Sequence, residues 1–210
     1  MNITKITNDY IYNHPSTRDC IGKRLINYSA LARRIIKDAK LKKDNFDAIV
    51  IACRRYAEKA AKTEAQEEQI MRVLSSSKLE VKTKIAVAIL SKSANPENLL
   101  KLEHEAKKSA ENFHLIEGTK SITIMLSQEF LEKAKKLFRH SIINIHTNLV
   151  EVIVKSPEEI EFTQGFTAYL CSLLNEHNIN IVELSSCWTD TIIVIEEKDL
   201  SNALRVLSVK

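Results

Sequence analysis

The feature that constrains the fold most is an order of strand and helix patterns that occurs twice in the later two thirds of the chain. Apolar and polar residues alternate over Val81–Ile89, the period of a half-buried β-strand. A helix, two short strands, a second helix and a strand at 142–145 follow. The same order begins again at Leu149 and stops after a helix that ends near Leu207. The sequence predicts two consecutive ferredoxin-like βαββαβ units, the last lacking its final strand.

These two units would occupy residues 78–146 and 147–210 of an α+β protein. The absent strand would leave one edge of the last sheet uncovered. Open edges present unpaired backbone groups and tend to pair with another chain. We therefore expect a homodimer or a larger assembly.

The first third of the chain has the pattern of a helical domain. Apolar residues over 16–74 recur with helical spacing, and no strand-like alternation interrupts them. Asn27 or Ser29 would cap the second of three helices, since both residue types are favoured at that position. Three short helices joined by short turns, the last one basic, are the outline of a helix-turn-helix domain. We predict such a domain at residues 1–77.

Charge is distributed unevenly along the chain. Residues 1–77 hold 15 Lys and Arg against 9 Asp and Glu, and residues 78–146 hold 12 against 8. Residues 147–210 hold 4 against 10. A basic first domain would contact the phosphates of duplex DNA, although a merely solvated helix face explains the same pattern. The candidate DNA-binding residues are Arg33, Arg34, Lys37, Arg54, Arg55, Lys59 and Lys62.

Several classes of function are disfavoured by composition. The three glycines lie too far apart to form a phosphate-binding loop. The four cysteines form no C-x-x-C pair, and the histidines lack metal-binding spacing, so we expect buried, reduced thiols and no metal or cofactor. No apolar run approaches the ~20 residues that cross a bilayer. We expect a cytoplasmic protein that is not an enzyme.

Residues in the second unit agree in order and spacing with a known family. Gly165 opens the first helix, and the run Asn178–Ile181 forms part of the second strand. The pattern Asp-x-x-x-Ala-x-x-x-Leu closes the unit over Asp199–Leu207. Over about Val150–Leu207 the chain resembles an ACT domain, and it is most similar to the regulatory ACT domains of aspartate kinases. The unit at 78–146 would then be a degenerate ACT domain, supported by topology alone.

The resemblance implies that the second unit binds a free amino acid. A glycine at a strand-to-helix turn permits close approach to the backbone, and the amides of a helix N-terminus favour a carboxylate. Asp190 would meet an ammonium group. A turn glycine and a hairpin aspartate without any ligand remain the simpler interpretation. The candidate ligand-binding residues are Gln164, Gly165, Phe166, Asn180, Ile181, Ser185, Ser186 and Asp190.

Two functions of different classes fit these features. In the first, the protein is an amino-acid-responsive transcriptional regulator, in which the helical domain binds DNA and the ACT-like units sense the effector. In the second, it is a regulatory subunit that binds an amino acid and docks on a metabolic enzyme such as aspartate kinase. The basic helix faces favour the first function, and the expected open sheet edge favours the second.

Overall fold

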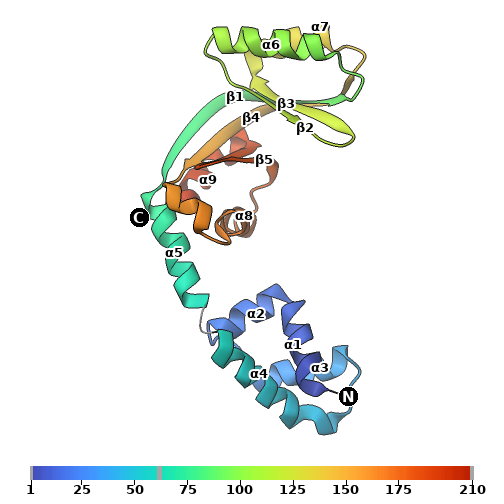
Figure 1. The fold of residues 1–210 in the computed structure, drawn as a ribbon, viewed down its shortest axis with the longest axis vertical. Coiled ribbons are helices and arrows are strands. Elements are labelled where there is room, and N and C mark those ends of the chain that lie inside the picture. The colour runs from blue at the N-terminus through green and yellow to red at the C-terminus, as the bar shows by residue number, and fades with distance from the viewer. Residues whose placement is uncertain (1, 61–62, 209–210) are drawn as a thin grey trace. The chain divides into compact units, whose positions relative to one another are not determined.

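The computed structural model describes residues 2–60 and 63–208. The chain divides into two compact units, Met1–Met71 and Arg72–Lys210, called here the helical unit and the sheet unit (Figure 1). Within the described residues, no helix is both long enough and apolar enough to cross a membrane.

The helical unit confirms that the first part of the chain is helical. Of the two caps that the sequence predicts, Asn27 and Ser29, it is Asn27 that caps α3. Its side-chain oxygen accepts hydrogen bonds from the backbone amides of Ser29 and Ala30, both at 3.0 Å. The helix-turn-helix assignment itself stays a prediction. The helices are α1 (Ile3–Tyr12), α2 (Pro15–Gly22), α3 (Tyr28–Asp38), α4 (Phe46–Ala60) and α5 (Thr63–Ser76), which reaches into the sheet unit, with the 3₁₀ helix η1 (Lys43–Asn45) before α4.

Helix α1 is not predicted by the sequence pattern. Only Thr7 and Ile11 are buried in this helix, so its apolar stripe is too thin to stand out in the sequence. Ile11 joins residues of the following helices, among them Ile35 of α3 and Ile49 of α4, in one buried core. The first helix is therefore stabilised by tertiary packing more than by its own pattern.

The sheet unit is built on a six-stranded antiparallel sheet with the strand order β2-β3-β1-β4-β6-β5. The strands are β1 (Lys78–Ser91), β2 (Phe113–Glu117), β3 (Ser121–Ser127), β4 (Ile142–Lys155), β5 (Ile181–Cys187) and β6 (Asp190–Glu196). The helices are α6 (Pro96–Lys108), η2 (Gln128–Phe130), α7 (Leu131–Leu137), η3 (Glu158–Phe162), α8 (Phe166–Glu176), η4 (Glu197–Asp199) and α9 (Leu200–Leu207).

The sheet consists of two halves that share the long strands β1 and β4. In the α6 half, β3 and the early part of β4 flank Ile85–Ser91 of β1, and β2 forms the edge. In the α8 half, Lys78–Lys82 of β1 pairs with the later part of β4, which pairs with β6 and then β5. Helices α6 and α7 cover the α6 half, and α8 and α9 lie with the α8 half (Figure 1).

No strand follows α9 within the described residues, as expected, but the expectation of an open edge in the last sheet is wrong. Lys78–Lys82 pairs antiparallel with β4, from Lys78 opposite Lys155 to Lys82 opposite Glu151, and covers the edge that the sequence analysis left open. Strand β1 is long enough to pair in both halves. The alternation of apolar and polar residues along it does not show where its partner strands change. An open final edge therefore no longer supports a dimer.

The end of the first predicted unit and the start of the second form one strand. The sequence predicts separate strands at 142–145 and 149–154, but β4 runs through both segments, so the expected boundary after residue 146 lies inside it. At the junction of the halves, Met125 from the α6 half packs with Leu149 and Val194 in a small buried core. The two halves are therefore parts of one continuous structure.

Candidate functional site

The start of α8 is the most distinctive turn in the sheet unit. Gly165 adopts the left-handed conformation there, with φ 84° and ψ 0°, which glycine tolerates at little cost. The next side chain, Phe166, is buried and anchors the first turn of the helix. Gly165 itself supplies no capping side chain, and the first turn of α8 holds no acidic residue. The N-terminus of α8 therefore offers the positive end of a helix dipole to a ligand.

A hollow of about 400 Å³ lies beside this turn. Its walls come from η3, the start of α8 and the hairpin between β5 and β6. Trp188 at the hairpin tip has φ 51° and a side chain that is 63% exposed. The lining residues are Ile160, Glu161, Thr163, Gly165, Phe166, Thr167, Ala168, Ser186 and Trp188. A volume of this size falls within the range of ~300–1,000 Å³ that is usual for small-molecule sites.

The structure brings together only part of the predicted ligand site. Gly165, Phe166 and Ser186 line the hollow beside α8. Asn180 and Ile181 line a separate hollow of about 390 Å³, together with residues from the end of α8. The opposing wall that the resemblance implied is therefore not part of the first hollow.

The remaining predicted ligand residues lie around these hollows without lining either. Gln164 is exposed just before the turn, and Ser185 is half-buried on β5 opposite Ile192. Asp190 opens β6 opposite Lys155, whose pKa is raised by a hydrogen bond to Glu80 and, to a smaller extent, by the charge of Asp190. The Asp190 carboxylate therefore already lies near an ammonium group of the protein.

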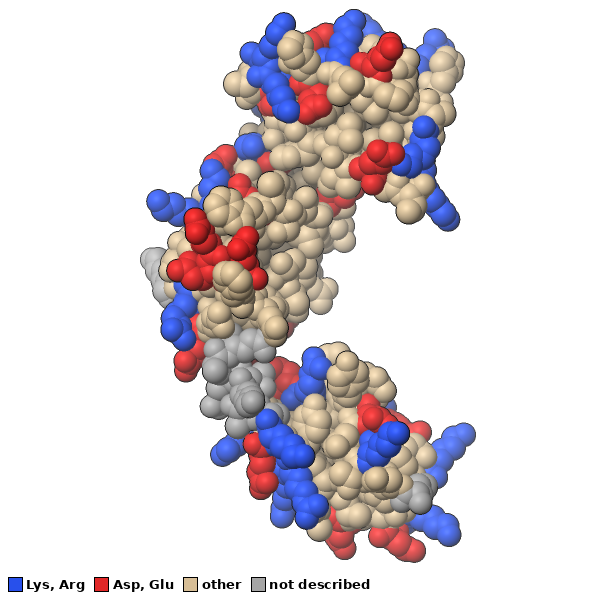
Figure 2. Space-filling model, in the orientation of Figure 1, with Lys and Arg blue, Asp and Glu red and all other residues tan. Residues whose placement is uncertain are grey.

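Glu161 lines the hollow but is not among the ligand-binding residues predicted from the sequence. A run of acidic residues, Glu158, Glu159 and Glu161, immediately precedes the turn and was the available signal. Acidic side chains gather over the region of η3 and α8 in Figure 2. Glu161 is thus better placed than Asp190 to meet the ammonium group of a ligand in this hollow.

The predicted DNA-binding residues lie on α3 and α4, and Lys62 lies outside the described residues. The other six are exposed. Arg34 is held in place, because its Nε lies 2.7 Å from Oδ2 of Asp38, which also accepts a hydrogen bond from the Tyr10 hydroxyl at 2.8 Å. These two contacts hold the pKa of Asp38 below its ordinary value. Arg34 therefore has a structural role within the helical unit.

The other predicted DNA-binding residues on α3 and α4 form no ion pair like that of Arg34 among the contacts of the described residues. The Arg33 guanidinium lies over the Phe46 ring, 5.8 Å from its centroid, a cation–π contact that leaves the group exposed. Arg54 and Arg55 are exposed on α4, as is Lys59 near its end. Figure 2 shows Lys and Arg side chains over much of the helical unit.

Two observations concern metal binding and the cysteines. They include no group of three or more His, Cys, Asp and Glu side chains that could hold a metal ion. Burial raises the pKa of the Cys53 thiol to about 11, so it is unreactive as a nucleophile. All four cysteines are free, but only Cys53 is buried and Cys187 is exposed, so the expectation of uniformly buried thiols is wrong.

Comparison with known proteins identifies the later part of the sheet unit. Residues 144–209 match the family model described as "ACT domain". This segment is an ACT domain. The resemblance found in the sequence is therefore confirmed for this region, which includes the glycine turn, the hollow beside α8 and the β5–β6 hairpin. No curated protein matches the sequence.

Solved structures with a similar fold include regulatory parts of aspartate kinases. The aspartokinase α and β subunits align with a TM-score of 0.51 at 14% identity, over 66% of this chain and 95% of that chain. The regulatory subunit of aspartate kinase from Thermus flavus aligns with a TM-score of 0.50 at 12% identity, over 61% of this chain and 94% of that chain.

The aspartate kinase of Clostridium acetobutylicum aligns with a TM-score of 0.49 at 19% identity, over 62% of this chain and 33% of that chain. The matched region thus spans about a third of that enzyme. At these identities the likeness is one of fold alone.

Proposed function

We propose that this protein is an amino-acid-responsive regulator and that the amino acid binds in the hollow beside α8. The observation that carries the proposal is the left-handed Gly165 at the border of a hollow of about 400 Å³ within the ACT domain. Glycine lets a ligand approach the backbone, and the helix N-terminus attracts an anionic group.

The chemistry of the lining suits a zwitterion. The ligand carboxylate would lie against the backbone amides at the start of α8, where first-turn amides have no acceptor within the helix. Its ammonium group would lie near Glu161, across the hollow. Its side chain would extend toward Trp188, whose exposed ring offers an apolar surface. The protein would thus bind both charges of a free amino acid.

Calorimetric titration of the full chain with each of the twenty amino acids tests this proposal. We expect heat from at least one of them, and we expect Gly165→Val to remove it, because a β-branched side chain is strained at positive φ and enters the hollow. Asn180→Ala is the matched control in the second hollow and should leave binding intact. Loss of binding in the control alone would place the ligand in the second hollow. No heat with any amino acid would contradict the sensor function.

We further propose that the helical unit binds duplex DNA through the exposed basic residues of α4. The specific observation is that Arg54, Arg55 and Lys59 are exposed, whereas Arg34 on α3 is paired with Asp38. Contacts of this kind neutralise phosphates, so the affinity should fall steeply with salt.

A retardation assay with the full chain at increasing salt tests DNA binding. Arg55→Ala combined with Lys59→Ala should weaken binding and reduce the salt slope by about one for each lost phosphate contact. Arg34→Ala serves as the control, because its side chain is already paired. If wild type does not retard DNA at low salt, docking on a metabolic enzyme becomes the better function. That alternative no longer draws support from an open final edge, since β1 covers it.

A further inference from the structure

The two halves of the sheet are joined at a strained point in both connecting strands. Lys84 in β1 and Asn148 in β4 have φ of 57° and 56°. The pairing of the two strands is also irregular here, with register shifts between Lys82 and Ile85 and between Ile85 and Val87. The left-handed conformation is disfavoured for a lysine, and asparagine tolerates it better. Backbone strain is thus present at Lys84 and Asn148, where the two halves of the sheet meet.

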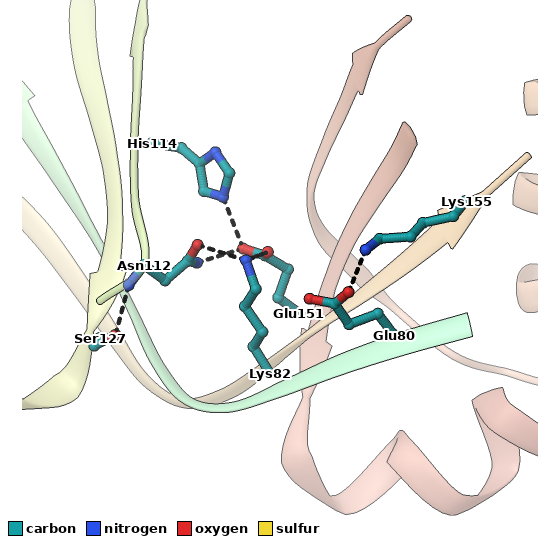
Figure 3. A network of polar contacts seen from close by, with 7 residues as sticks. All are labelled: Glu80, Lys82, Asn112, His114, Ser127, Glu151 and Lys155. Atoms are coloured by element: carbon teal, nitrogen blue, oxygen red, sulfur yellow. Dashed lines mark hydrogen bonds and ion pairs between the residues drawn. The ribbon is translucent and has the colours of Figure 1, made fainter. Parts of the chain in front are cut away.

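A buried carboxylate lies beside this point. Glu151 of β4 is fully buried, and its Oε2 accepts a hydrogen bond from Nδ2 of Asn112 at 2.6 Å (Figure 3). Nε2 of His114 lies 3.1 Å from the same oxygen. Nζ of Lys82 lies 3.4 Å from the other oxygen, Oε1, and donates to Oδ1 of Asn112 at 3.1 Å. We call these four residues the Glu151 network.

The Glu151 network connects the two halves. Glu151 and Lys82 form a cross-strand pair in the α8 half. His114 lies on β2, and Asn112 immediately precedes that strand, so both belong to the α6 half. The backbone amide of Asn112 also donates to the Ser127 hydroxyl at the end of β3, 3.1 Å away (Figure 3). Only side chains, and no strand pairing, link β2 to β4 here.

The Glu151 network stabilises the charged carboxylate, but one carboxylate oxygen lacks a hydrogen bond. Burial alone would raise the pKa of Glu151, but the contacts with His114, Asn112 and Lys82 outweigh it and hold the pKa below its ordinary value. The carboxylate is therefore kept charged by groups from both halves. Among the described residues Oε1 has no hydrogen-bond partner, only the ion pair with Lys82. Partly satisfied buried networks are weaker than complete ones.

We propose that this junction is a hinge and that the Glu151 network is the latch that holds the two halves in the arrangement of this structure. Hinges are formed by a few residues that absorb a change in backbone angles, and Lys84 and Asn148 are the residues placed to do so. Releasing the latch frees the α6 half to turn relative to the α8 half. The proposal does not depend on the amino-acid site.

Distance measurement on the full chain tests the hinge. A ketone-bearing residue replaces Lys120, in the turn between β2 and β3, and Ser172 on α8. A nitroxide label is attached to each of the two residues. The distance between the two labels reports the separation of the halves. Both positions are exposed. We expect one narrow distance distribution in the wild type. Glu151→Gln should broaden or shift it and should raise amide exchange at residues 112–114 about tenfold or more, because a hydrogen bond to a charged group is lost.

Glu80→Gln is the matched control, because Glu80 pairs with Lys155 on the same two strands but within the α8 half. It should leave both readouts unchanged. Asn112→Ala removes the bridge from the α6 half without touching the carboxylate, so it decides the matter if Glu151→Gln does not fold. A folded Asn112→Ala variant with the wild-type distance and exchange would overturn the proposal.

Discussion

The two halves of the sheet share an order of elements but begin their first helices in opposite ways. At α6, the side-chain oxygen of Asn95 accepts a hydrogen bond from the amide of Glu97 at 2.8 Å, and Pro96 takes the first helical position. At α8, Gly165 supplies no side chain, and a hollow adjoins the turn. The same topology thus has one closed and one open helix N-terminus. A ligand site is decided by these few residues and not by the fold.

The largest expected effects come from deleting one large core side chain in each half. Phe138→Ala and Phe166→Ala should each cost about 3–5 kcal/mol in the free energy of unfolding, since both rings are buried. Because β1 and β4 run through both halves, we expect one shared transition. Urea unfolding followed by the fluorescence of Trp188, the single tryptophan, reports the α8 half. If Phe138→Ala leaves the urea midpoint of the Trp188 signal unchanged, the two halves unfold separately and are two domains.

The next effect concerns the carboxylate between the halves. The folded-state pKa of Glu151 is below its ordinary value of 4.5, so its stabilisation is present above that pH and is lost as pH falls through the folded-state pKa. Glu151→Gln should cost about 1.5–3 kcal/mol at pH 7, the range for hydrogen bonds to charged groups.

The cost of Glu151→Gln should shrink as the pH is lowered below 4.5, as measured by urea unfolding at several pH values. The groups that face Glu151 are His114, Asn112 and Lys82. Glu80→Gln, in an exposed pair, provides the control for acid effects in general. A cost that is independent of pH would mean that the charge of Glu151 does not stabilise the fold.

The smallest expected effects come from substitutions at the N-termini of α6 and α8. Asn95→Ala should destabilise the protein by about 1 kcal/mol through loss of the cap of α6, with amino-acid binding unchanged. Gly165→Ala should cost about 1 kcal/mol or more through strain at positive φ, and it should also weaken binding. Thermal unfolding with and without the amino acid separates the two. If Asn95→Ala and Gly165→Ala weaken amino-acid binding equally, the N-termini of α6 and α8 do not differ in their role in binding.

Local features of the fold could be predicted from the sequence because they depend on neighbouring residues. The cap at Asn27 and the Asn95-Pro96 helix start follow from residue preferences that act within one turn. The strand predicted at Val81–Ile89 follows from its alternating period, whereas the glycine turn at Gly165 was expected from the family resemblance. The first helix was not predicted because Ile11 is its one large side chain that is fully buried in the core.

Features that depend on distant pairing could not be predicted in this way. The alternation in β1 gives its two faces but not its partners, so the change of partner near Lys84 is absent from the pattern. The Glu151 network joins residues from three separate segments and has no spacing signature. The candidate ligand site was predicted from resemblance, and the structure keeps Gly165, Phe166 and Ser186 together but places Asn180 and Ile181 at another hollow.

The shared strand β1 has a consequence for how the protein is made. Lys78–Lys82 leaves the ribosome first among the strands of the α8 half, yet its partners in β4 end at Lys155, and the rest of that half is synthesised last. The nascent chain must therefore keep this segment unpaired while the entire α6 half is added. Pairing between distant segments slows folding. A fragment cut at the bounds of the matched ACT segment would lack its closing strand, so this ACT domain is complete only within the longer chain.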